Sequence, residues 1–167
     1  MSEAKPEPIL EYLRKEIAET QQRREKLLLV KIAFVSALLG FGGGEFKEIG
    51  SIYQALYVVP LIATFFDLMI QGEHFSIRRA GTFLRLNSSP LERAYEVFVG
   101  KNRDVFFRYG SAGFTSLSYF ASIVLLRKSN HLRFGIEWAW FAVLFLIFGF
   151  SIWYVNRRMR ELDRLEL

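Results

Sequence analysis

The sequence predicts an all-α, polytopic membrane protein with four transmembrane helices. Of its 167 residues, 51% are hydrophobic and 17 are Phe. The charged residues are segregated into short segments between long apolar runs, which is typical of a membrane protein rather than of a soluble core. The distribution of Lys and Arg also requires an even number of spans. At this length the whole chain, residues 1–167, is expected to form one domain.

The N-terminal segment, residues 8–26, predicts an amphipathic cytoplasmic helix. Pro8 suits a first helical position, and Ile9, Leu13 and Ile17 recur at a spacing of four. Three interpretations stay open for its narrow apolar stripe: packing on its own protein, lying in the membrane plane, or oligomerising as a coiled coil.

Four apolar runs follow, and they are the predicted transmembrane helices. Their bounds are 27–41, 52–70, 105–126 and 134–155. The first is about fifteen residues long, which is short for a membrane span. We expect it to continue the N-terminal helix and to end at the glycines of 42–44. Lys31 lies one turn inside this run and is expected to extend to the interface.

The long segment between the second and third spans, residues 71–104, is basic and predicts two short helices. The first has Ile77 and Leu84 opposite its arginines, and is expected to lie at the membrane surface. The second begins at the capping sequence Ser89-Pro90 and ends at Gly100.

The C-terminal segment, residues 156–167, predicts a cytoplasmic continuation of the last span. It carries a weak apolar stripe of Met159, Leu162 and Leu165. We expect this stripe to pack against the apolar stripe of the N-terminal helix, so that the two ends of the chain form a short stalk below the bilayer.

The basic residues predict that both termini and the long middle segment face the cytoplasm. Six Lys and Arg lie in the N-terminal segment, seven in and beside the middle segment, and four at the C-terminus. The two short loops together hold four. Because cytoplasmic segments carry the excess of positive charge, this distribution fixes the orientation.

The composition gives no support to an enzyme, a metal site or a cofactor. The chain has no Cys, and its two histidines, His74 and His131, are expected on opposite sides of the membrane. Zinc and iron sites in membrane enzymes need several His and carboxylate ligands together. No catalytic motif is present.

Asp67, near the inner end of the second span, is the residue most indicative of function. A carboxylate inside a span is costly unless it is paired or hydrated. It is expected either to pair with Arg78, Arg79 or Arg108, or to handle ions or protons. It belongs to a polar stripe along the second span, and the third span carries a matching hydroxyl stripe. Together the candidate pore or interface residues are Tyr57, Thr64, Asp67, Gln71, Ser111, Thr115, Ser118 and Ser122. Such stripes either let helices pack closely or line a water-filled path.

The basic cytoplasmic surface is expected to contact anionic lipid head groups. Its candidate residues are Arg78, Arg79, Arg85 and Arg93. A cytoplasmic protein or a nucleotide signal is a further candidate partner for this surface, whereas nucleic acid is not expected.

The segments VPLIATFFD, from Val59, and SIRRAGTFLR, from Ser76, resemble segments of small bacterial multi-span membrane proteins. Some of those proteins are similar to membrane effectors of antiviral defence systems. The resemblance implies a homo-oligomer that perturbs the bacterial inner membrane. The predicted function is therefore an oligomeric gated pore or membrane-perturbing effector, controlled through its basic cytoplasmic face. The alternative is a non-conducting scaffold or accessory subunit that recruits a partner.

Overall fold

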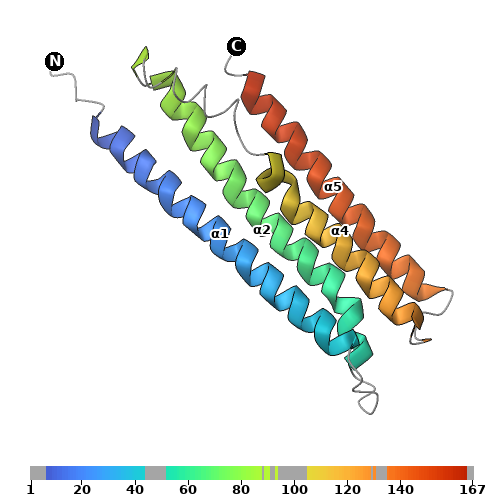
Figure 1. Cartoon of the computed structure of the whole chain (residues 1–167). Helices are drawn as coiled ribbons and strands as arrows, with labels where there is room; N and C mark the ends of the chain where they lie inside the picture. Colours follow the sequence, from blue (N-terminus) through green and yellow to red (C-terminus); the bar gives the residue numbers. More distant parts are fainter. Residues whose placement is uncertain are drawn as a thin grey trace.

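The computed structural model describes residues 7–43, 52–87, 89–90, 93, 105–128, 130 and 135–164. Within these residues the chain is all-α, as the sequence predicts. The four helices are α1 (Glu7–Gly43), α2 (Ile52–Asn87), α4 (Val105–Lys128) and α5 (Ile136–Arg164). Successive helices run in opposite directions, so α1 begins at the same end of the bundle at which α5 finishes (Figure 1).

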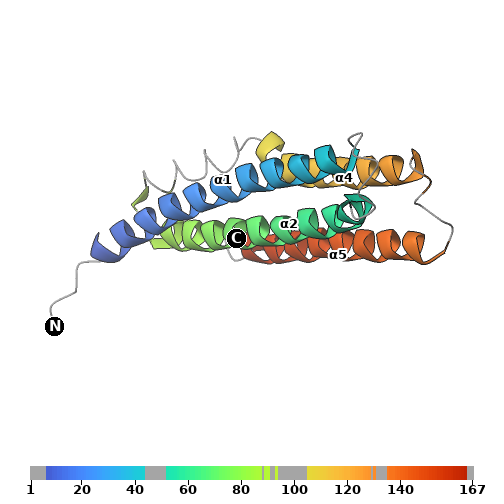
Figure 2. The same cartoon turned by 90° about the horizontal axis from the view of Figure 1, so that it is seen from below.

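The second helix is the centre of the bundle. It contacts α1, α4 and α5, while α1 also contacts α4. In the view from below, α1 and α4 lie on one side of α2 and α5 lies on the other (Figure 2). One apolar cluster joins Val35 of α1 to Val59 and Ala63 of α2. A second cluster joins α2, α4 and α5 through Leu56, Tyr119, Leu126, Phe141 and Leu144.

Three of the helices are long and apolar enough to cross a membrane: α2, α4 and α5. Their outward faces carry large apolar side chains, such as Phe65, Leu117 and Leu146, at 60, 62 and 70% exposure. Many large exposed apolar side chains are costly in water and are expected on the surface of a helix in lipid. The chain is therefore an integral membrane protein.

The prediction that the N-terminal segment continues into the first apolar run is confirmed, because α1 is one helix of 37 residues. The predicted third span, 105–126, lies within α4. The last span continues into the C-terminal segment as part of α5, as predicted.

The prediction of a separate surface helix after the second span is wrong. Residues 71–87 are the last turns of α2, which runs without interruption for 36 residues and through Pro60. The reason is that α1 offers this part of α2 a partner. Ile77 and Leu84 are buried there rather than facing lipid head groups.

The predicted stalk between the two ends of the chain is also corrected. The N-terminal half of α1 lies beside the C-terminal half of α2 in both views, and α2 separates it from α5 (Figures 1 and 2). Arg23 forms an ion pair with Glu73 at 3.6 Å, and Arg24 lies 3.4 Å from Nδ1 of His74. Leu165 and the side chain of Leu162 lie outside the described residues.

At Ser89-Pro90 the predicted capping sequence does begin a helical turn, because the backbone N–H of Arg93 donates to the carbonyl of Ser89 at 2.9 Å. The rest of the predicted second loop helix, residues 94–100, lies outside the described residues.

Candidate functional site

The two polar stripes predicted from the sequence face each other inside the bundle. On α2, Thr64 and Asp67 are buried at 3 and 2% exposure. On α4, Thr115, Ser118 and Ser122 are also buried, and Ser111 is half-buried. We call the polar residues between α1, α2 and α4 the polar seam: Lys31, Thr64, Asp67, Ser111, Thr115, Ser118 and Ser122.

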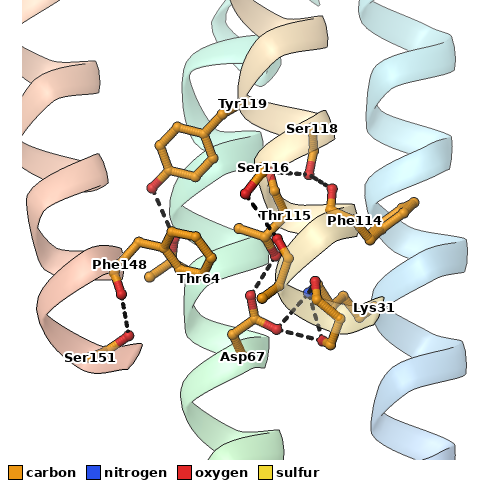
Figure 3. Close-up of polar contacts among 12 residues, drawn as sticks. Lys31, Thr64, Asp67, Phe114, Thr115, Ser116, Ser118, Tyr119, Phe148 and Ser151 are labelled. Carbon is orange, nitrogen blue, oxygen red and sulfur yellow. Dashed lines mark hydrogen bonds and ion pairs between the residues drawn. The ribbon is translucent and has the colours of Figure 1, made fainter. Parts of the chain in front are cut away.

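The centre of the seam is a fully buried ion pair between α1 and α2. Nζ of Lys31 lies 2.7 Å from Oδ1 of Asp67, and the two side chains are 0 and 2% exposed (Figure 3). Taking two charges out of water costs several kcal/mol per ion, and their attraction offsets this only when further hydrogen bonds satisfy both groups.

Both groups have those further bonds. The three N–H groups of the Lys31 ammonium have three oxygen acceptors: Oδ1 of Asp67, the carbonyl of Ser111 at 2.8 Å, and Oγ of Ser111 at 2.9 Å. Oγ of Ser111 donates in turn to Oδ1 of Asp67, and Oγ1 of Thr115 donates to Oδ2, each at 2.5 Å. Lys31, Asp67 and Ser111 thus form a closed ring of hydrogen bonds that ties three helices together.

The ion pair lies within the apolar segments, toward the ends that are far from the connection between α1 and α2. Asp67 is fifteen residues after the start of α2 at Ile52, and Lys31 is twelve residues before the end of α1 at Gly43. At 1.5 Å per residue, these intervals are about 22 Å and about 18 Å. Because α1 and α2 are antiparallel neighbours, the two charges come to the same level.

Two expectations about these charges are corrected. Lys31 does not extend to the interface, and the partner of Asp67 is Lys31 rather than Arg78 or Arg79. Arg78 is eleven residues further along the same helix, about 16 Å away, which is beyond the reach of its side chain. The side chain of Arg108 lies outside the described residues.

A second polar contact crosses the seam about one turn nearer to the start of α2 at Ile52. The hydroxyl groups of Thr64 and Tyr119 lie 2.9 Å apart, and either can be the donor. The ring of Tyr119 stacks against Phe148 of α5, with 6.1 Å between the centroids. This contact connects the polar seam to the α5 side of the bundle.

The hydroxyl of Ser118 is satisfied within α4. It donates to the carbonyls of Phe114 and Thr115 at 2.8 and 3.0 Å. Since this bond is local, the packing role predicted for small hydroxyl residues accounts for Ser118.

The remaining stripe residues lie at the two ends of the seam. Tyr57 is half-buried near the start of α2, where its carbonyl accepts from Nε1 of Trp140 at 3.1 Å. Oγ of Ser122 and Oε1 of Gln71 are buried without a hydrogen-bond partner within the described part of the chain. Polar positions therefore continue along the helices on both sides of the ion pair.

The four arginines of the predicted basic surface differ in their exposure. Arg79 and Arg93 are exposed, whereas Arg78 and Arg85 are half-buried. Nε of Arg93 donates to the carbonyl of Arg85 at 3.0 Å, so Arg93 caps the C-terminus of α2. The reason for the difference is that the continuous α2 turns Arg78 and Arg85 partly into the bundle.

Exposed basic residues are also present at the end of α5, next to two aromatic side chains. The guanidinium groups of Arg157 and Arg158 lie 5.7 and 5.6 Å from the ring centroids of Trp153 and Tyr154. A hydrogen bond to the Tyr154 hydroxyl, with help from Glu161, raises the pKa of Arg158 above its ordinary value. Arginine is always charged in proteins, so Arg158 presents a positive charge at the level where lipid phosphates are expected.

Sequence reasoning identified Asp67 and both stripes but missed the role of Lys31. The signal was present, because two opposite charges lie at similar distances from the loop that joins two consecutive apolar runs.

Among the described residues there is no cluster of three His, Cys, Asp or Glu side chains that would hold a metal ion. The chain matches no family model, no curated protein and no solved structure at a significant level. The ion pair and the seam are therefore the features that bear on function.

Proposed function

We propose that the protein is a four-span integral membrane protein that forms a gated ion path, with the Lys31–Asp67 ion pair holding the path closed. The fully buried, fully hydrogen-bonded ion pair inside the apolar segments carries this proposal. Ionisable side chains at membrane depth are expensive, and they mark ion or proton pathways by default. An apolar pair of similar volume would hold the helices together at least as stably, because it has no charges to desolvate.

The closed state follows from how the charges are matched. Every N–H of the Lys31 ammonium is used within the ring, and α1 packs beside α2 and α4 at this level. Moving α1 away would remove one charge from the seam and leave the carboxylate of Asp67 beside the hydroxyls of Ser111 and Thr115. Those groups attract water, so the same residues that seal the seam would line a hydrated path once α1 moves.

The proposal of a fourth span rests on α1. Leu29, Val30 and Phe34 on its outward face are 67, 52 and 47% exposed, as expected for contact with lipid. Its main polar group within residues 27–41 is Lys31, whose charge is matched by Asp67. An even number of spans agrees with the basic residues at both ends of the chain and in the middle segment, and this assigns both termini to the cytoplasm.

Oligomerisation is part of this proposal, and it rests on the resemblance to small bacterial membrane proteins rather than on the seam. The buried stripe residues are not available to line an axis between subunits in this conformation, because they face one another within one subunit. The oligomer would therefore bring together subunits that each hold their own closed seam. Native mass spectrometry of the detergent-purified protein measures this directly, and a clean monomer would contradict this part of the proposal.

The test of gating is ion flux from liposomes. Purified wild-type protein, Lys31→Met and Asp67→Asn are reconstituted at equal density and matched for helicity and monodispersity. Both variants are expected to leak at least about tenfold faster than wild type, since about 1.4 kcal/mol lost from the closed state shifts its equilibrium with the open state tenfold. Ser116→Ala is the matched control, because this α4 hydroxyl is exposed and bonds only its own helix. Equal flux in all four proteins would refute the proposal.

A scaffold function is the second candidate, and the paired extension of α1 and α2 favours it. Arg23–Glu73 and Arg24–His74 join the two helices beyond their apolar segments, where Thr20 is also buried. This extension gives a rigid polar surface on which a partner could bind. Purification of the protein together with a second protein in a fixed ratio, without any flux, would support this function instead.

A further inference from the structure

The three oxygens around the Lys31 ammonium all come from α2 and α4. They are Oδ1 of Asp67, and the carbonyl and hydroxyl oxygens of Ser111, at 2.7, 2.8 and 2.9 Å from Nζ. The hydroxyl of Thr115 orients the same carboxylate through Oδ2. We call these groups of Asp67, Ser111 and Thr115 the oxygen cage. The contribution of α1 to this cage is the cation itself (Figure 3).

The chemistry of the cage is that of a site for a hard cation. Carboxylate, hydroxyl and backbone carbonyl oxygens are the groups that replace the hydration shell of such ions in proteins. The ring of Phe114 lies 5.7 Å from Nζ and adds the attraction of an aromatic face for a positive charge. None of these contacts depends on the rest of the Lys31 side chain.

The charge of the cage selects a monovalent ion. Asp67 supplies one negative charge, and no cluster of three His, Cys, Asp or Glu side chains occurs in the described ranges. Calcium sites use six to eight oxygen ligands with several carboxylates, and magnesium demands a near-ideal octahedron. One carboxylate at this depth balances one positive charge, as the Lys31 ammonium does.

We propose that α2 and α4 form a binding site for a monovalent cation, and that Lys31 of α1 fills this site as a tethered cation in the closed conformation. This inference rests on the proposed gated function, because it names the class of ion that the same groups would receive when α1 moves away. Removal of the Lys31 ammonium should leave the cage open to a free cation of similar size and charge.

The test is rescue of Lys31→Ala by added cations, measured as the thermal midpoint Tm of the purified protein in detergent. Methylammonium, sodium and potassium chloride are compared with N-methyl-D-glucamine chloride at equal ionic strength. Methylammonium at about ten times its Kd is expected to raise Tm by about 3 °C or more. The double variant Lys31→Ala/Asp67→Asn should show no such rise, and neither should wild type, in which the cage is filled. If Lys31→Ala can be purified only when one of these cations is present, the recovered yield is the measurement and it supports the site.

A rise that is equal in the single and double variants would be a general salt effect and would overturn the inference. The inference is also overturned if methylammonium, sodium and potassium neither raise the Tm of Lys31→Ala nor increase its purified yield. The liposome assay keeps the two proposals apart. If the variants leak but cations do not rescue Lys31→Ala, the proposal of a gate stands and the cation site is refuted. Cation rescue without a leak in any variant would support the site and refute the gate.

Discussion

Replacement of one member of the Lys31–Asp67 pair should destabilise the protein far more than replacement of both. Lys31→Met removes three hydrogen bonds and leaves the carboxylate of Asp67 buried without its counter-ion. Interhelical hydrogen bonds in membranes contribute about 0.6 kcal/mol each on average, so the three account for about 2 kcal/mol. The uncompensated charge brings the expected loss in the free energy of unfolding to about 3–5 kcal/mol. Asp67→Asn should cost a similar amount, because it leaves a buried ammonium.

The double variant Lys31→Met/Asp67→Asn carries neither charge. Its expected loss is about 2 kcal/mol or less, close to that of the hydrogen bonds alone, which gives a coupling energy of about 4 kcal/mol or more between the two positions. The assay is unfolding of the detergent-solubilised protein by sodium dodecyl sulfate, followed by helicity and by the fluorescence of its three Trp. If the loss in the double variant equals the sum of the two single losses to within about 0.5 kcal/mol, the two positions are not coupled. That result would refute the coupled pair.

Three further predictions follow from the same contacts. Thr115→Val should cost about 1 kcal/mol by removing a hydrogen bond to the buried carboxylate, whereas Ser116→Ala on the exposed face should change stability by less than about 0.5 kcal/mol in the same unfolding assay. Arg23→Gln should lower the free energy of unfolding by less than about 1 kcal/mol at low salt, and by no measurable amount at high salt. The reason is that Arg23 is 56% exposed, so solvent and salt screen its ion pair. The chain has no native Cys, so Tyr12→Cys and Phe41→Cys each introduce one reporter at an exposed position near opposite ends of α1. A membrane-impermeant maleimide should label Phe41→Cys in intact cells, and Tyr12→Cys only after permeabilisation. Labelling of both variants from one side would show that α1 does not cross the membrane.

Much of the fold could be predicted from the sequence because apolar runs and helix ends are local features. The spans at 105–126 and 134–155 coincide closely with α4 and the first part of α5. The stripe of Thr64 and Asp67 was visible because helical periodicity puts residues three and four apart on one face. The hydroxyl stripe of α4 was visible for the same reason.

The parts that failed depend on which helix packs against which. The apolar residues Ile77 and Leu84 predicted a surface helix, since a lone amphipathic segment after a span has lipid head groups as its nearest partner. The antiparallel α1 offers a better one, and α2 continues beside it. Similarly, the stripe of Ile9, Leu13 and Ile17 does not specify its partner, and α2 rather than α5 lies beside the N-terminal half of α1 (Figure 2).

Lys31 shows how one such contact changes the interpretation of a whole segment. As an isolated sequence, residues 27–41 are a marginal span, short and interrupted by a charge that costs about 3 kcal/mol at membrane depth. Beside α2 the same charge has a counter-ion 2.7 Å away and two more acceptors, so its penalty is largely offset. In the proposed four-span arrangement, the stability of α1 in the membrane is conditional on the carboxylate of Asp67. A segment whose insertion depends on one ion pair is well suited to move when that pair is broken, and this is why the fold and the proposed gate depend on the same two residues.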